Sequence, residues 1–98
     1  MNSYLKKALR LGLLVDQKQA AYGNSVDTAE QVLKVYLKPY QDVGGDYIIP
    51  AEMLRHLLLI VRILDKLSRI FASPGGDMMN ENPYQDIAGY GLLGITDD

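Results

Sequence analysis

The feature that most constrains the fold is a long helical pattern over about residues 50–72, in which apolar side chains fall on more than one face. Pro50 suits the first turn of a helix. The apolar residues of the pattern are Met53, Leu54, Leu57, Leu58, Ile60, Val61, Ile63, Leu64, Leu67, Ile70 and Phe71. A helix that is apolar on most sides is covered by other helices or by another subunit. The pattern therefore predicts a long central helix.

Two helices are expected before this central one. The first covers about residues 3–22 and ends at Gly23, because glycine takes a positive φ without steric cost. The second is expected to begin near Asp27, which stands three residues before Glu30 as in a loose capping box. Pro39 ends the second helix, since the residue before a proline avoids the α region.

A fourth helix is expected to open at Pro83, with Glu81 or Asn82 near its cap, and residues 40–49 are expected to form a loop. The sequence thus predicts one all-α domain over residues 1–98, with a fold like a four-helix bundle. A chain of 98 residues builds only a small core. We therefore also expect it to associate with copies of itself.

Composition excludes several classes of protein. There is no cysteine, so disulfides and thiolate metal sites are ruled out. The net charge of −2 does not suggest a protein that binds the nucleic-acid backbone, which would normally carry a basic surface. No apolar run is long enough to span a membrane, so no membrane partner is expected. These features favour a soluble protein of the cytoplasm.

The clearest polar cluster lies on the central helix. Arg62, Asp65, Lys66 and Arg69 stand at i, i+3, i+4 and i+7, which places them on one face. Three cations around one carboxylate leave a surplus of positive charge that suits phosphate groups. The alternative is a solvated face in which Asp65 and Arg69 form an i,i+4 ion pair.

Lys18, Tyr22, Gly23 and Asn24 form a second candidate cluster at the end of the first helix. A tyrosine ring can stack on a base, and the backbone amides that open the next helix can meet an anion. The alternative is a helix cap with a packed tyrosine.

Glu81, Asp86 and Tyr90 form the third candidate cluster, around the start of the fourth helix. The two carboxylates are favourable there because of the helix dipole, and they could also hold Mg²⁺ on the phosphates of a substrate.

Three blocks of sequence carry a resemblance that covers about residues 15–93. They are Lys18-x-x-x-Tyr22-Gly23, Arg62-Ile63-Leu64-Asp65-Lys66-Leu67-Ser68-Arg69 and Asn82-Pro83-Tyr84-Gln85-Asp86-Ile87-Ala88-Gly89-Tyr90. In these blocks the chain resembles the small phage proteins called nucleotide-modification-associated domains, which are similar to the all-α NTP pyrophosphatases of the MazG-like and dimeric dUTPase-like group. The resemblance implies an oligomeric four-helix domain with a nucleotide ligand. It would place around that ligand Lys18, Tyr22, Arg62, Asp65, Lys66, Arg69, Asp86 and Tyr90.

The chain departs from those pyrophosphatases in its carboxylates. They carry an E-x-x-E pair on one helix and an E-x-x-D pair on another to hold magnesium, and this chain has neither. Without clustered carboxylates, a Mg²⁺ that activates water is hard to build. Binding without turnover is therefore the leading hypothesis, with no cofactor required.

The leading hypothesis is a non-enzymatic protein that binds or sequesters a nucleotide or a nucleotide second messenger, as small phage proteins that blunt host defence signalling do. The predicted ligand-binding residues are Lys18, Tyr22, Asn24, Arg62, Asp65, Lys66, Arg69, Asp86 and Tyr90. Two alternatives remain open. One is a Mg²⁺-dependent NTP pyrophosphatase that uses Asp65, Glu81 and Asp86, and the other is an oligomeric interaction module without a small ligand.

Overall fold

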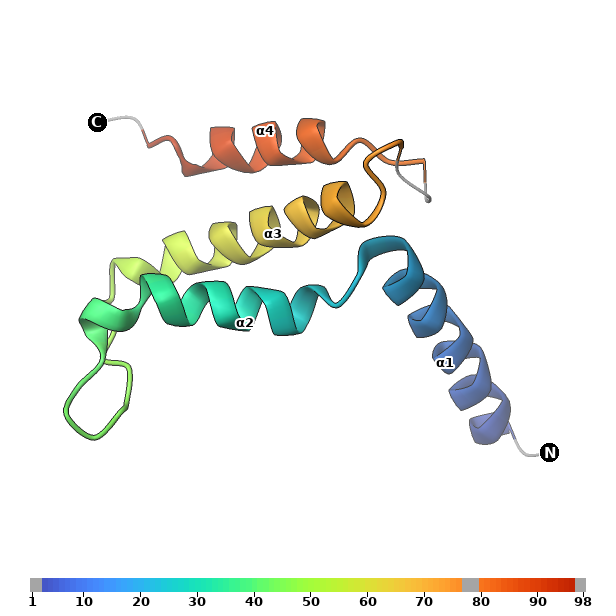
Figure 1. Cartoon of the computed structure of the whole chain (residues 1–98), viewed down its shortest axis with the longest axis horizontal. Coiled ribbons are helices and arrows are strands. Elements are labelled where there is room, and N and C mark those ends of the chain that lie inside the picture. Colours follow the sequence, from blue (N-terminus) through green and yellow to red (C-terminus); the bar gives the residue numbers. More distant parts are fainter. Residues whose placement is uncertain (1–2, 77–79, 97–98) are drawn as a thin grey trace.

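The structure is a computed structural model that describes residues 3–76 and 80–96, with the backbone alone at residues 21 and 22. It is built from helices, as the sequence predicts (Figure 1). Its elements are α1 (Ser3–Tyr22), α2 (Ser25–Tyr36), the short 3-10 helix η1 (Lys38–Tyr40), α3 (Met53–Ala72) and α4 (Pro83–Gly94). Within the described ranges there is no strand, only an isolated antiparallel bridge between Gln41 and Tyr47.

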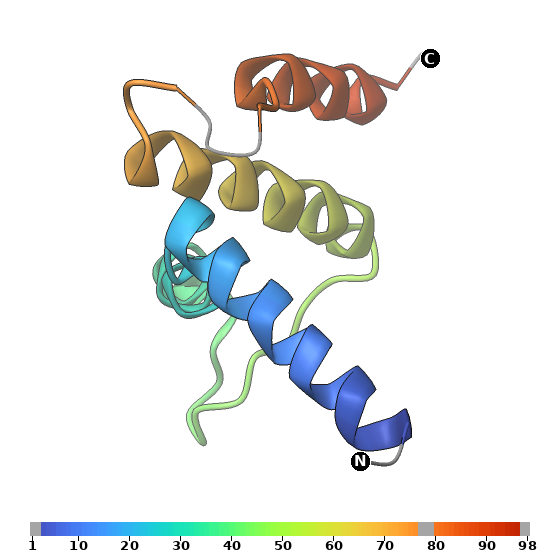
Figure 2. The same ribbon diagram turned by 90° about the vertical axis from the view of Figure 1, so that its right-hand side faces the viewer.

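Helix α3 occupies the centre of the arrangement. It runs between α2 on one side and α4 on the other, whereas α1 meets the rest of the chain only near its C-terminal end (Figure 1). The view turned by 90° shows the same order of α4, α3 and α2 (Figure 2). The chain is extended: its radius of gyration is 17.1 Å, against about 13 Å for a compact domain of this length.

Two predicted helix ends are confirmed. Gly23 terminates α1 with φ of +72°, and its N–H donates to the carbonyl of Gln19 at 2.8 Å. Asn82 caps α4, since its side-chain oxygen accepts from the N–H of Gln85 at 3.1 Å, and Pro83 opens the helix. Each cap uses a residue whose conformational preference fits that position.

Three predicted boundaries are wrong by a few residues. Helix α2 starts at Ser25, so Asp27 lies in its first turn and accepts from the Asn24 amide at 2.6 Å instead of capping the helix. Pro39 does not follow α2 directly but lies within η1. Helix α3 begins at Met53 rather than near Pro50, because residues 50–53 form a turn in which the N–H of Met53 donates to the Pro50 carbonyl at 2.9 Å.

The helices leave much apolar surface uncovered. No large side chain in the described part of the chain is fully buried, and the most buried residue is Arg69, which is 9% exposed. On α3, Leu58 is 70% and Phe71 84% exposed. The central helix is therefore only partly covered within one chain. Among the described helices, none is long and apolar enough to cross a membrane.

Candidate functional site

Two of the three predicted phosphate-binding cations tie α3 to the segment that leads into α4. The Arg69 guanidinium donates from Nη1 to the carboxylate of Glu81. Lys66 Nζ lies 3.3 Å from Asp86 Oδ2 and 3.9 Å from Glu81 Oε2. Both cationic side chains are largely buried, at 12% exposure for Lys66 and 10% for Arg69. Much of the positive charge predicted for this face is thus balanced by carboxylates that lie beyond α3 in the sequence.

The third cation, Arg62, is exposed and faces an aromatic ring instead. Its guanidinium carbon lies 5.7 Å from the centre of the half-buried Tyr90 ring, within cation–π range. About two helical turns closer to the start of α3, Arg55 Nη2 donates to the Leu93 carbonyl at 2.6 Å. Arginines therefore fix α4 along the length of α3, and Arg62 and Tyr90 line a shallow pocket of their own.

A different pocket brings together predicted residues from the first two clusters. It has a volume of about 300 Å³ and lies where the end of α1, the start of α2 and the second half of α3 meet. We call it the junction pocket. Its lining residues are Val15, Lys18, Gln19, Gly23, Ser25, Asp65 and Arg69.

The local sequence explains how the junction pocket forms. Asp65 and Arg69 are one helical turn apart, so they share a face of α3. Lys18 belongs to the last turns of α1, and the positive φ of Gly23 reverses the chain so that α2 begins at Ser25 beside them. The first backbone N–H groups of a helix lack partners within the helix and sit at the positive end of its dipole. The lining of the pocket therefore combines a helix start, one carboxylate and two cations, of which Arg69 is also paired with Glu81 outside the pocket.

The other predicted residues lie elsewhere. Asn24 lines a mostly apolar groove between α2 and α3, together with residues such as Val32 and Phe71. The side chain of Tyr22 lies outside the described residues. Glu81 and Asp86 meet Lys66, whereas Asp65 lines the junction pocket, and the described residues contain no group of three or more possible metal ligands. The structure does not gather the three carboxylates of the magnesium alternative.

Sequence reasoning missed three residues that line the junction pocket. They are Val15, Gln19 and Ser25, and they carry no local signal of a site, except that Gln19 follows Lys18 directly. The pairing of Arg69 with Glu81 also went unpredicted, since the two residues are twelve positions apart across a loop. Only spacings within one helix can be read from sequence.

Comparison with known proteins leaves the family resemblance as a hypothesis. No family model matches the chain, and no significant match was found among curated proteins or solved structures.

Proposed function

We propose that the chain binds a small phosphate-bearing ligand, a nucleotide or nucleotide second messenger, in the junction pocket and holds it without turnover. The observation that carries this proposal is the convergence of Lys18, Arg69 and the start of α2 on one pocket. These are the groups that proteins use to bind phosphate: cationic side chains and the N-terminus of a helix. A volume of about 300 Å³ is at the small end of the range for ligand pockets.

Lys18 is the residue of the pocket whose positive charge is most available to a ligand. It is exposed, and it forms no ion pair with any residue that the structure describes. Arg69 donates to Glu81 and also lines the junction pocket, so it contributes its positive charge to the attraction of an anion into the pocket. Asp65, the carboxylate of the pocket, repels phosphate. It therefore suits a sugar hydroxyl or a base N–H, and Tyr22, which follows Lys18 by one turn, is the candidate for stacking on the base.

Fewer residues bind the ligand in this proposal than the sequence predicts. Arg62 and Tyr90 line a separate pocket, and Lys66 and Asp86 are engaged with each other, so these four residues hold α4 rather than the ligand. The resemblance to phage nucleotide-modification-associated domains agrees with a nucleotide ligand. Such a protein would act in the cytoplasm of a bacterial host.

A thermal-shift screen tests the proposal. The purified chain is heated with mono-, di-, tri- and cyclic nucleotides, each with and without Mg²⁺. A ligand that binds only the folded state raises the melting temperature in a concentration-dependent way. We expect at least one nucleotide to do so without Mg²⁺. A panel in which no compound shifts the transition contradicts nucleotide binding.

A second function is favoured by a separate observation, namely that one chain does not bury its own apolar surface. The chain exposes 7785 Å², whereas a compact monomer of 10.9 kDa exposes about 5,600 Å². We propose that it forms a homo-oligomer, in which neighbouring subunits complete a helical bundle around α3. Self-association is compatible with ligand binding, and it is also what an interaction module without a small ligand would show.

A further inference from the structure

We infer that α1 is a docking arm whose apolar side chains pack into an open groove on α3 of a second copy. In the same dimer, α1 of the second copy packs into the groove on α3 of the first. We call this groove the α3 groove, and its residues are Leu54, Leu57, Leu58, Val61 and Arg62. This inference rests on the proposed self-association, and it identifies α1 and the α3 groove as the two surfaces that meet.

The exposed area is sufficient for such an exchange. The excess over a compact monomer is about 2,200 Å² per chain, whereas a standard interface buries only about 800 Å² on each partner. The excess is therefore large enough for an obligate interface, such as two reciprocal arm contacts would form.

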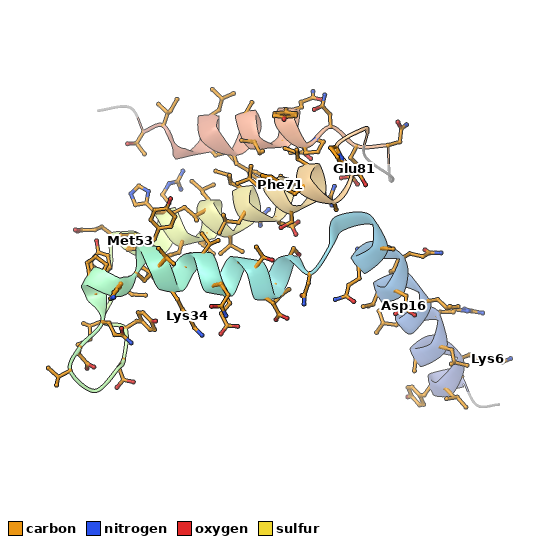
Figure 3. All side chains as sticks on the ribbon, in the orientation of Figure 1. Lys6, Asp16, Lys34, Met53, Phe71 and Glu81 are labelled. Carbon is orange, nitrogen blue, oxygen red and sulfur yellow. The ribbon has the colours of Figure 1, made fainter. Side chains whose placement is uncertain are left out.

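The arm carries apolar side chains on surface that the described part of its own chain leaves exposed. Helix α1 projects from the other helices, with Lys6 and Asp16 marking its two halves (Figure 3). Leu11 is 61% exposed and Leu13 65% exposed, and Leu9 and Leu14 are also exposed. In proteins a helix gains most of its stability from packing of its apolar face, so a projecting helix with exposed leucines is stabilised by docking.

The α3 groove is the surface that the arm fits. Leu54, Leu58 and Val61 stand at i, i+4 and i+7, and the same face continues to Asp65 in the junction pocket. The chain's own α1 reaches that face only at the Asp65 end. Towards the start of α3 the groove stays open, with a volume of about 500 Å³, and Leu58 is 70% exposed.

Charge argues for a second copy as the occupant and against arms that pair with each other. Helix α1 has four basic residues and one acidic residue, a net charge of +3. Because the whole chain carries −2, the remainder carries −5. Two arms side by side would repel each other, whereas an arm and the body of another copy carry opposite net charges, although the one charged residue that lines the groove, Arg62, is itself a cation.

A complementation experiment tests this pairing. One variant alters the arm (Leu9→Lys with Leu13→Lys), and a second alters the groove (Leu58→Glu). A control places a lysine at Val43, which is fully exposed in the loop after η1. Mass is measured by sedimentation at micromolar concentration, and helicity by circular dichroism.

We expect the unaltered chain and the control Val43→Lys to sediment as a dimer or a larger assembly. The arm variant and the groove variant, each measured alone, should sediment as monomers, with or without loss of helicity. A mixture of the two variants contains one intact arm and one intact groove, so it should regain the dimer mass and helicity. A folded monomer from the unaltered chain would overturn both self-association and the docking arm. Full assembly of Leu58→Glu alone, or no recovery in the mixture, would overturn the arm-in-groove pairing while leaving self-association in place.

Discussion

Lys66 Nζ lies 3.3 Å from Asp86 Oδ2, which joins the middle of α3 to the first turn of α4. A lysine selected for phosphate would keep its charge available to a ligand. This one is largely buried and is met by two carboxylates, those of Asp86 and Glu81. The contact is therefore structural, and it assigns part of the predicted phosphate face to helix packing.

The pairing predicts coupling between the two residues in a double-mutant cycle. Lys66→Ala and Asp86→Ala should each lower the free energy of unfolding, and their effects should fall short of additive by about 0.5–1 kcal/mol. Urea denaturation of the four proteins measures the coupling. Strictly additive losses would show that the ion pair does not form in solution.

Arg69 and Arg62 should differ in their effect on stability. Arg69→Ala removes a buried guanidinium and leaves the Glu81 carboxylate without that donor, so it should cost about 1–3 kcal/mol of unfolding free energy. Arg62→Ala loses only an exposed cation–π contact with Tyr90, which should cost about 0.5–1 kcal/mol. Equal losses in urea denaturation would contradict this distinction.

Removal of Arg62 should not affect ligand binding, because this side chain lies in a pocket separate from Lys18. For whichever nucleotide gives a thermal shift, calorimetry on Arg62→Ala should return an affinity within about twofold of that of the unaltered chain. A tenfold loss would mean that the ligand spans both pockets, as the sequence-based set of residues predicts.

The magnesium-dependent alternative predicts a different outcome for the carboxylates. If the chain were a pyrophosphatase, Asp65→Asn and Asp86→Asn would each abolish pyrophosphate release from an NTP in the presence of Mg²⁺, while the fold stayed intact. Because the described residues contain no group of three possible metal ligands, we expect no pyrophosphate release from the unaltered chain. Release that both substitutions remove would contradict binding without turnover.

Sequence periodicity was sufficient for the helices and for several of their ends. The apolar pattern of α3, the glycine after α1 and the Asn82-Pro83 start of α4 act locally, and each can be read from neighbouring residues. The starts of α2 and α3 were misplaced by two or three residues because other residues nearby can also open a helix. Helix α2 begins after Asn24, whose backbone carbonyl accepts from the N–H of Thr28, and α3 begins after the turn at Pro50.

The site was only partly predictable for a physical reason. Local spacing places Asp65 and Arg69 on one face of α3, but it cannot say which other element covers that face. Glu81, just before α4, pairs with Arg69, whereas Lys18 and Asp65 line one pocket beside the turn at Gly23. Both arrangements depend on how the helices are placed, so the predicted cluster is divided between an ion-pair network and a pocket.

Calorimetric titration of Lys18→Ala tests the central claim most directly, with the nucleotide that gives the largest thermal shift as the probe. Lys38→Ala is the matched control, since it removes an exposed lysine of η1, which follows the end of α2 that lies away from the junction pocket. A charged hydrogen bond contributes about 1.5–3 kcal/mol, so Lys18→Ala should weaken binding by about ten- to a hundredfold. Lys38→Ala should bind like the unaltered chain. Equal affinity in Lys18→Ala and the unaltered chain would show that the junction pocket is not the binding site.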